Sequence, residues 1–255
     1  MVKSGPVNLG LIGYPLGHSF SARYFTEKFE REGIPGNYSL FPIESIDCLQ
    51  ALLDSHPNLR GLNVTIPYKQ SVLPILDSIS QDAAAIGAVN VIRIDHDAEG
   101  HRSLHGFNTD WRGFLDSLRP FLRPDITRAL VLGTGGASKA VEYALGRIGI
   151  GVTLVSRHPS KRGIISYSDI TPELIGATGL IVNTTPLGMY PNIESAPDIP
   201  YDLLDNCHIC FDLVYNPAMT QFMRLAEKSG ATVVNGLDML YRQADLSAEI
   251  FMPNR

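Results

Sequence analysis

The feature that most constrains the fold is a strand-turn-helix-strand pattern over residues 129–157. The apolar run 129–132 ends in a turn that contains Gly133, Gly135 and Gly136, and a helical pattern and a second apolar run follow. Apolar runs that alternate with helical segments are typical of parallel sheets covered by helices. The glycines allow a tight turn and let another group approach the backbone closely.

The same alternation extends over most of the 255 residues. Strands are predicted at residues 8–13, 37–42, 59–64, 179–183, 209–214 and 231–234, a hairpin at 89–95 and 101–107, and helices at 21–32, 45–53, 110–118 and 237–251. A further helix is expected to begin near Pro67, because proline suits a first helical turn. These patterns predict an α/β fold of two lobes, residues 1–108 with 238–255 and residues 109–237, with ligands bound in the cleft between them.

The bulk composition excludes several classes of protein. The formal net charge of -5 argues against binding to nucleic acid or to an anionic membrane surface through overall charge. No apolar run approaches the ~20 residues that span a bilayer, and the first residues lack the apolar core of a signal peptide. We therefore expect a cytoplasmic protein that acts on a small molecule.

The glycine turn predicts a dinucleotide site. A helix that opens directly after such a turn directs its free N–H groups and the positive end of its dipole toward an anion such as a pyrophosphate. The fingerprint is matched loosely, because Ser138 stands where the third glycine is expected. The complete strand-helix-strand unit, in which Ala144, Leu145 and Ile148 are expected to face the sheet, nevertheless favours a dinucleotide over a purely structural turn. The predicted contacts here are Gly133, Gly135, Gly136 and Ala137.

The end of the second strand predicts the type of dinucleotide. NAD-selective sites place an acidic residue there to bind the ribose hydroxyls. This chain has Ser156 and Arg157, with Lys161 close behind. Arginine binds phosphate through paired, charge-assisted hydrogen bonds. The alternative is a solvated charged loop, but the missing acid favours NADP, with Ser156, Arg157 and Lys161 as contacts.

Two groups of metal-binding residue types do not predict a metal site. Cys207 and Cys210 lack a second cysteine pair, and the longer segment 207–214 also has the pattern of a buried strand. Residues three apart on a strand point to opposite faces, so both cysteines are expected to pack in the core. The second group, in the expected hairpin, comprises His96, His101, His105, Asp95 and Asp97. This hairpin is expected to be exposed and offers no apolar shell for an ion.

Seven ordered motifs resemble those of the shikimate dehydrogenase family, and together they cover essentially the whole chain. They are residues 13–21 (GYPLGHSFS), 61–69 (GLNVTIPYK), 87–90, 106–110, 183–189, 212–217 and 235–240 with Gln243. The resemblance implies an enzyme that reversibly reduces 3-dehydroshikimate to shikimate with NADPH. The first lobe would then be the substrate-binding catalytic domain and the second a Rossmann-like NADP-binding domain.

The resemblance implies that Lys69 and Asp110 handle the proton while the nicotinamide handles the hydride. It assigns the substrate carboxylate to Ser19 and Ser21. The other substrate contacts would be Asn63, Thr65, Asn90, Tyr215 and Gln243, and the nicotinamide side would be lined by Asn183, Thr184, Gly188, Met189, Gly236 and Met239. The sequence leaves open which of Lys69 and Asp110 moves the proton in each step.

Each residue also has an ordinary structural interpretation when it is taken singly. Ser19 or Ser21 would cap a helix, Lys69 would be a solvated lysine, Asp110 a helix N-terminal charge, and the methionines core residues. The chain also departs from the family pattern: Ala22 and Arg23 follow Ser21, and His158 stands where a threonine usually follows the cofactor arginine.

Other functions remain open at this stage. They are a quinate/shikimate dehydrogenase with relaxed cofactor use, a two-lobed NADP dehydrogenase for another small acid, and a non-catalytic NADPH-binding sensor. A homodimer is also left open.

Overall fold

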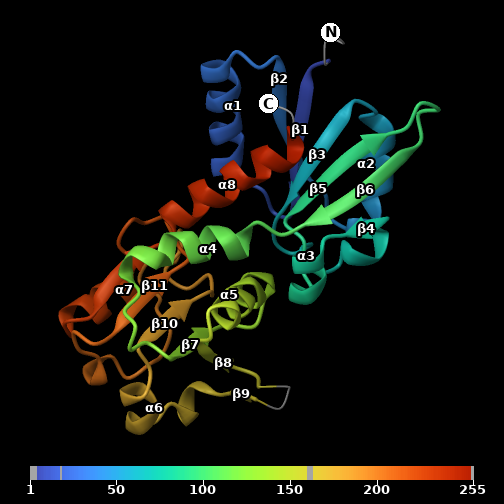
Figure 1. Cartoon of the computed structure of the whole chain (residues 1–255). Coiled ribbons are helices and arrows are strands. Elements are labelled where there is room, and N and C mark those ends of the chain that lie inside the picture. The colour runs from blue at the N-terminus through green and yellow to red at the C-terminus, as the bar shows by residue number, and fades with distance from the viewer. Residues whose placement is uncertain (1–4, 18, 160–162, 254–255) are drawn as a thin grey trace. The chain divides into compact units, whose positions relative to one another are not determined.

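The computed structural model describes residues 5–17, 19–159 and 163–253 and divides the chain into two compact units (Figure 1). Unit 1 comprises Met1–Thr109 with Ala244–Arg255, and unit 2 comprises Asp110–Gln243. One boundary therefore falls at the start of helix α4 (Asp110–Leu118), and the other falls inside helix α8 (Leu237–Phe251). None of the described helices has the length and apolar character needed to cross a membrane.

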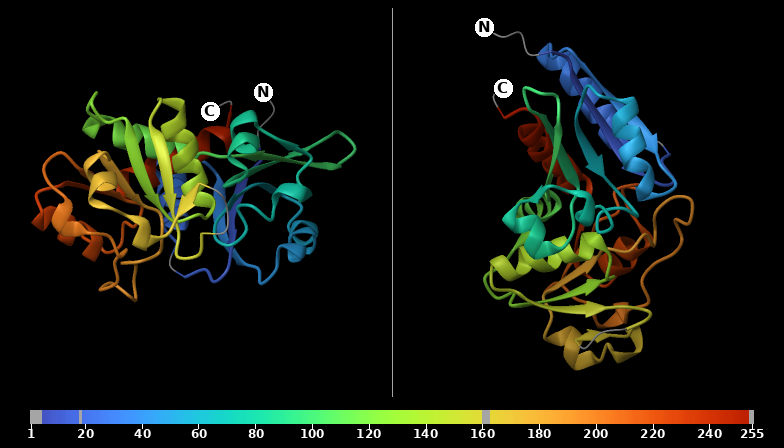
Figure 2. Two further views of the ribbon diagram at one scale, coloured as in Figure 1. Left: turned by 90° about the horizontal axis from the view of Figure 1, so that it is seen from below. Right: turned by 90° about the vertical axis from the view of Figure 1, so that its right-hand side faces the viewer.

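Unit 1 is a mixed six-stranded sheet with helices. Its elements are β1 (Val7–Gly13), α1 (Phe20–Glu32), β2 (Gly36–Pro42), α2 (Leu49–Ser55), β3 (Leu59–Val64), β4 (Ser78–Ile79), α3 (Gln81–Ile86), β5 (Val91–His96), β6 (Arg102–Phe107) and the second half of α8. The strand order is β2-β1-β3-β5-β6-β4. The far end of the β5–β6 hairpin projects from the rest of the unit (Figures 1 and 2).

The strand directions bring several loops to one edge of this sheet. β1 and β3 are parallel, so Gly13 and Val64 end at the same edge. β5 is antiparallel to β3 and pairs its first residue, Val91, with Asn63. β6 returns antiparallel and pairs its last residue, Phe107, with the same Val91. The segments that follow β1, β3 and β6, and the one that precedes β5, therefore all leave from this edge.

Both faces of the unit 1 sheet are covered. On one face Leu49 and Leu53 of α2 belong to a buried apolar cluster with strand residues such as Ile92. An aromatic group joins α1, β2 and the end of α8, where the rings of Phe25 and Tyr38 stack 4.8 Å apart and Phe251 lies 6.0 Å from Phe25. Gly61 permits this packing, since a Cβ there would lie 2.3 Å from the Phe251 ring.

Unit 2 is a wholly parallel sheet. Its elements are α4, β7 (Arg128–Leu132), α5 (Gly136–Arg147), β8 (Gly151–Val155), β9 (Ile164–Ile165), α6 (Pro172–Gly176), β10 (Leu180–Asn183), β11 (Ile209–Asp212), α7 (Gln221–Lys228), β12 (Thr232–Asn235) and the first half of α8. The strands lie in the order β12-β11-β10-β7-β8-β9. This is the 3-2-1-4-5-6 order of a Rossmann fold, which confirms the predicted fold class.

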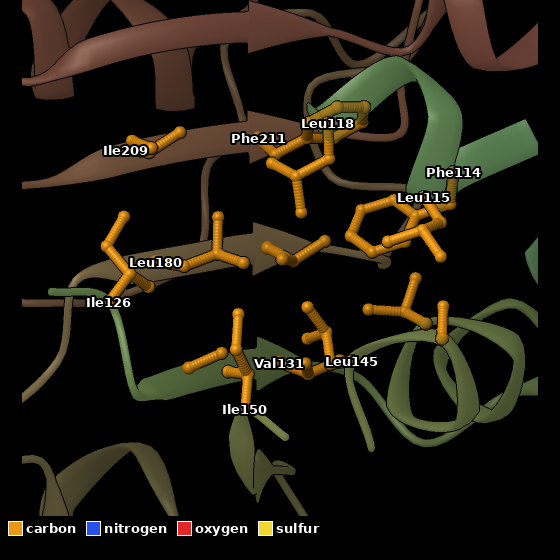
Figure 3. Close-up of a cluster of buried hydrophobic side chains, with 14 of the residues drawn as sticks. Phe114, Leu115, Leu118, Ile126, Val131, Leu145, Ile150, Leu180, Ile209 and Phe211 are labelled. Atoms are coloured by element: carbon orange, nitrogen blue, oxygen red, sulfur yellow. The ribbon is translucent and has the colours of Figure 1, made fainter. Parts of the chain in front are cut away.

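The alternation of side chains along β7 supplies both cores of unit 2. Val131 faces a cluster with Phe114 of α4 and Leu145 of α5, which Figure 3 shows in close-up. Leu130 and Leu132 face a second cluster that includes Phe222 of α7. A strand that is buried on both faces has a continuous apolar sequence, because every side chain faces one core or the other. This is why residues 129–132 give the clearest strand signal in the sequence.

One local prediction was wrong, and one predicted helix differs in the type of its first turn. No α-helix begins at Pro67: residues 66–72 form turns, followed by a 3-10 helix at Leu73–Ile75. Pro74 lacks a backbone N–H and would interrupt a helix that began at Pro67. The predicted helix at 45–53 is a 3-10 helix at Ile46–Cys48 that continues into α2.

Two packing predictions also need correction. Cys207 is exposed and precedes β11, in a turn where its N–H donates to the Asp205 Oδ1 at 2.8 Å. Cys210 is buried as expected. Ile148, which was expected to face the sheet with Ala144 and Leu145, lies beyond the end of α5 and is 40% exposed.

The close-packed interface between α4 and β11 predicts a large stability effect. Phe211 is fully buried, and its ring meets that of Phe114 edge-on at 5.1 Å. Phe211→Ala should lower the free energy of unfolding by about 3–5 kcal/mol, because it leaves a cavity. The matched control Phe121→Ala, at a ring that is 39% exposed, should cost about 1 kcal/mol or less. Urea denaturation measures both values, and equal costs would contradict this packing.

Candidate active site

The site in unit 2 lies where the order of its strands reverses. Chain connections leave β7 toward β8 on one side and β10 toward β11 on the other, and ligands of open α/β sheets bind outside the carboxyl ends of strands at such a point. The two strand ends are tied together here. Thr184 donates from its backbone N–H and from its Oγ1 to the Leu132 carbonyl, at 3.0 and 2.7 Å.

The three glycines of the turn have different physical roles. Gly133 has φ +115°, and a Cβ at this position would lie 2.6 Å from the Thr184 Oγ1. Gly135 occupies the N-cap of α5 with φ -81°, and a Cβ there would meet nothing within 4 Å. Gly136 and Ala137 begin the helix. The fold itself therefore requires glycine at 133, while the open space at 135 leaves the helix N-terminus accessible to an anion.

Ser138 shows why the loose fingerprint still forms the turn. Its side chain is 1% exposed, and its Oγ donates to the Gly135 carbonyl at 2.7 Å. The small hydroxyl is thus folded back into the turn where a third glycine is usual. This bond adds a local constraint on the backbone that faces the helix N-terminus.

The loop after β8 carries the predicted phosphate contacts. The Ser156 N–H donates to the Ile165 carbonyl at 2.9 Å, and its Oγ accepts from the His158 N–H at 3.2 Å. Arg157 stands exposed between these two bonds. Its charge lowers the pKa of Tyr167 in part, against the larger effect of burial, which raises it. Lys161 lies outside the described residues.

The loops after β10 and β11 are held by a buried polar cluster. The Asn183 Nδ2 donates to the Asp212 Oδ1 at 2.9 Å, and its Oδ1 accepts from the backbone and hydroxyl of Thr185 at 3.0 and 2.6 Å. Asp212 also accepts from the Thr220 Oγ1 at 2.6 Å and from the Val214 N–H at 3.0 Å. Asn183 is fully buried, so its side chain serves the shape of the loop.

Asp212 and Thr220 were absent from the predicted set, although Asp212 lies in a quoted motif. A signal was present in the sequence: an aspartate that directly follows the apolar run 209–211 must be hydrogen-bonded if it is buried. Burial raises the pKa of Asp212 from its ordinary value near 3.8 to about 6, while hydrogen bonds from Thr220, Val214 and Asn183 lower it in part.

The remaining predicted residues of unit 2 divide between loops and core. Gly188 has φ +86° and donates its N–H to the Ser195 Oγ at 2.9 Å, and the adjacent Met189 is 47% exposed. Gly236 packs so closely that a Cβ would lie 2.2 Å from the Leu213 carbonyl oxygen. Met239 is 7% exposed and belongs to the Phe114 cluster, so its packing role is the one the fold supports.

The last two predicted substrate residues of unit 2 lie in different settings. Tyr215 is half-buried in the loop after β11. Gln243 of α8 is 9% exposed and donates from its Nε2 to the Leu240 carbonyl at 2.9 Å.

The two predicted catalytic residues belong to different units. Lys69 is half-buried in the turn after β3, and its carbonyl accepts from the Val89 N–H at 2.7 Å, next to Asn90. Asp110 is 5% exposed and is the first residue of α4 in unit 2.

A buried polar network runs along the loop edge of unit 1. The Tyr38 hydroxyl donates to the Asn63 Oδ1 at 2.9 Å, and the Asn63 Nδ2 donates to the Ser247 Oγ at 3.2 Å. The Ser247 and Thr109 hydroxyls lie 3.2 Å apart. Thr109 is bonded twice to Asn90, from its N–H to the Oδ1 at 2.8 Å and from the Asn90 Nδ2 to its Oγ1 at 2.9 Å.

The network reaches one serine of α1, Ser21. Burial raises the pKa of Tyr38, and a hydrogen bond with the Ser21 hydroxyl lowers it in part. Ser19 holds the N-cap position of α1, but its side chain makes no cap hydrogen bond there. Thr65 is half-buried beyond β3 and donates its N–H to the Ile12 carbonyl at 2.9 Å. Unit 1 therefore links Ser21, Asn63 and Asn90 through Tyr38, Ser247 and Thr109. These last three residues have no signal of their own in the sequence that predicts this role.

The sequence of this chain is similar to those of known proteins. Residues 11–92 match the family model of the shikimate dehydrogenase substrate binding domain. The NADP(+) shikimate dehydrogenase of Clostridium beijerinckii is 38% identical, over 95% of this chain and 90% of that protein. That of Syntrophomonas wolfei is 35% identical, over 96% of this chain and 89% of the relative. The chain belongs to the shikimate dehydrogenase family.

The fold is also similar to those of solved structures. Shikimate 5-dehydrogenase of Thermus thermophilus, solved with NADP(H) and shikimate, is 32% identical and aligns over 97% of this chain and 94% of its own, with a TM-score of 0.83. Ligand-free 5-ketofructose reductase of Gluconobacter sp. strain CHM43 is 27% identical, with coverages of 98% and 94% and a TM-score of 0.80. The fold of this family therefore also occurs in an enzyme named for another substrate.

The glycine geometry predicts two separable effects in this shikimate dehydrogenase family member. Gly133→Ala should lower the free energy of unfolding by about 2 kcal/mol or more, from the positive φ and the contact with Thr184. Gly135→Ala should cost about 1 kcal/mol or less, yet weaken NADP⁺ binding, because its methyl group enters the open space at the helix N-terminus. Chemical denaturation and calorimetric titration measure the two effects. Equal stabilities of the two variants would contradict this division.

Asp212 predicts a pH dependence of stability. Its folded-state pKa of about 6 lies above the ordinary value near 3.8, so its contribution is complete below about pH 4 and is lost as the pH rises through about 6. Compared with the isosteric Asp212→Asn, the wild type should lose up to about 3 kcal/mol of stability between pH 4 and 7. Urea denaturation across this range measures the difference, and a constant difference would refute the prediction.

Proposed function

We propose that this protein catalyses the reversible, NADP-dependent reduction of 3-dehydroshikimate to shikimate. The observation that carries the proposal is the buried network of unit 1, because it links Ser21, Asn63 and Asn90 at the loop edge of the sheet. Lys69 lies in the turn that follows β3 at the same edge. A small ring with one carboxylate and several hydroxyls needs many short hydrogen-bonding side chains held at fixed positions. The membership of the chain in the shikimate dehydrogenase family supports the same reaction.

The substrate carboxylate would bind at the start of α1. Ser19 occupies the N-cap of this thirteen-residue helix, and Ser21 lies in its first turn. Hydroxyl groups at a helix N-terminus add donors to the free backbone N–H groups and to the positive end of the dipole. We assign the substrate hydroxyls to Asn63, Thr65 and Asn90 of unit 1, together with Tyr215 and Gln243 of unit 2.

The NADP cofactor would lie along the carboxyl edge of the unit 2 sheet. The pyrophosphate is assigned to the N-terminus of α5 at Gly135–Gly136–Ala137, and the 2′-phosphate to Ser156 and Arg157, with Lys161 as an additional predicted contact. Thr184, Gly188, Met189 and Gly236 belong to the loops that we assign to the nicotinamide side. When bound, the nicotinamide supplies and accepts the hydride.

Lys69 and Asp110 would complete the reaction by moving the proton. Oxidation of the alcohol requires removal of the hydroxyl proton as the hydride leaves, and reduction requires a donor beside the carbonyl oxygen. An amine and a carboxylate are both groups that can accept a proton from the substrate oxygen or return one to it. The cytoplasmic location and the homodimer remain predictions.

The activity is tested with purified protein by the absorbance band of NADPH. Shikimate with NADP⁺ should generate NADPH, and NAD⁺ or quinate should react far more slowly. NAD⁺ belongs in the assay because a Listeria monocytogenes relative at 26% identity was solved with shikimate and NAD. 5-Ketofructose with NADPH tests the activity named for the Gluconobacter relative. If the protein binds NADPH but turns over none of these substrates, the proposal is refuted and a non-catalytic NADPH-binding sensor is favoured instead.

Lys69→Ala should lower turnover by roughly 10²–10⁴-fold while NADPH binding persists, because the general acid-base group is removed and the cofactor residues of unit 2 remain. Steady-state kinetics with shikimate and a fluorescence titration of NADPH measure the two properties. The control Lys228→Ala, at an exposed lysine of α7, should behave like the wild type. Turnover in Lys69→Ala equal to that of the control would remove Lys69 from the mechanism.

A further inference from the structure

The Asn63 side chain is held at both ends of its amide group. The Tyr38 hydroxyl donates to its Oδ1 at 2.9 Å, whereas its Nδ2 donates to the Ser247 Oγ at 3.2 Å and to the Asn90 carbonyl at 3.4 Å. The Tyr38 hydroxyl donates to the amide oxygen, and the Ser247 hydroxyl accepts from the amide nitrogen. Unless these hydroxyls rearrange, the Asn63 amide has only one orientation that satisfies both bonds. An inverted amide would face the Asn90 carbonyl with its own oxygen.

Asn90 is oriented by the same network. The Thr109 N–H donates to the Asn90 Oδ1 at 2.8 Å, and a backbone N–H cannot change its role from donor to acceptor. The Asn90 Nδ2 therefore faces the Thr109 Oγ1, at 2.9 Å. The Thr109 Oγ1 in turn lies 3.2 Å from the Ser247 Oγ, so Ser247 stands between the two asparagines.

Ser247 is poorly explained as an ordinary helix residue. It is fully buried near the end of α8, and it lies 184 residues from Asn63 in the chain. Burying a hydroxyl costs free energy of desolvation unless the hydroxyl is hydrogen-bonded. An alanine at position 247 would have no hydroxyl to desolvate and a higher helix propensity. Its hydroxyl joins an asparagine on β3 to a threonine after β6.

We propose that Ser247 and Tyr38 are positioning residues that set the amide orientation of Asn63 and, through Thr109, the placement of Asn90 toward the substrate hydroxyls. This inference rests on the proposed function for its substrate. It adds two residues that act through the asparagines without being assigned any contact with the substrate. A bound substrate hydroxyl requires either a donor or an acceptor from the neighbouring amide. An amide turned by about 180° would present its NH₂ group where its oxygen is needed, or the reverse.

Three single variants test the proposal. Ser247→Ala removes the acceptor of the Asn63 Nδ2. Tyr38→Phe removes the donor to the Asn63 Oδ1, and with it the bond to the Ser21 hydroxyl, while keeping the ring that stacks on Phe25. The control is Ser117→Ala, which removes another buried helix hydroxyl, bonded to the Phe114 carbonyl at 2.8 Å outside this network. Both test variants should raise the KM for shikimate about 3- to 10-fold, with the KM for NADP⁺ unchanged, because a misoriented Asn63 amide costs about one net hydrogen bond to the substrate. The control should change neither KM.

The double variant Tyr38→Phe/Ser247→Ala tests whether the two hydroxyls act on one amide. The increase in KM should be smaller than the product of the two single increases, because the first substitution already releases the Asn63 orientation. If the increase in KM of the double variant equals the product of the two single increases, the two hydroxyls act independently and the proposal is overturned. An unchanged KM for shikimate in folded Tyr38→Phe would also overturn it, as would parallel increases in both KM values.

A measurement without substrate separates this inference from the proposed function. The side-chain NH₂ of Asn63 should exchange slowly with solvent in wild-type NMR spectra, and faster in Ser247→Ala and in Tyr38→Phe. Unchanged exchange in both variants would refute the positioning role, whatever the enzyme turns over. Faster exchange in both variants, with no shikimate turnover by the wild type, would refute the proposed function and leave the positioning of Asn63 in place.

Discussion

Polar side chains buried at the ends of apolar strands must find their hydrogen-bond partners within the protein, and both units are organised by this requirement. In unit 1 the amide of Asn63 is satisfied by Tyr38 and Ser247. In unit 2 the carboxylate of Asp212 is satisfied by Asn183 and Thr220. An unpaired group at such a place would cost a large fraction of the stability of a domain. The loops that carry the candidate site therefore take their shape from the buried strand ends.

Steric fit complements these hydrogen bonds at the glycine turn. Thr184 binds the Leu132 carbonyl and leaves no room for a side chain at Gly133, whereas the space beside Gly135 is open. The turn is thus closed toward the sheet and open toward the helix N-terminus. Pyrophosphate binding requires this asymmetry, because the anion must approach backbone N–H groups without displacing the strand ends.

The sequence predicted most elements within a few residues, because alternation along strands and turn chemistry are local properties. Its errors also had local causes. Pro67 was read as a helix start although Pro74 follows, and Cys207 was placed in a strand that begins only at Ile209. The motifs of the shikimate dehydrogenase family located the candidate site but could not distinguish side chains that face a ligand from those that support the loops.

By itself the sequence determined the α/β class, the parallel unit around the glycine turn, the membership of the family and the residues expected to carry the chemistry. Only the tertiary structure decided that Asn183 turns inward, that Met239 packs in the core, and that Tyr38 and Ser247 join the network of Asn63. The physical reason is distance along the chain. Partners such as Asn63 and Ser247 are 184 residues apart, and only the folded sheet and helix bring them together.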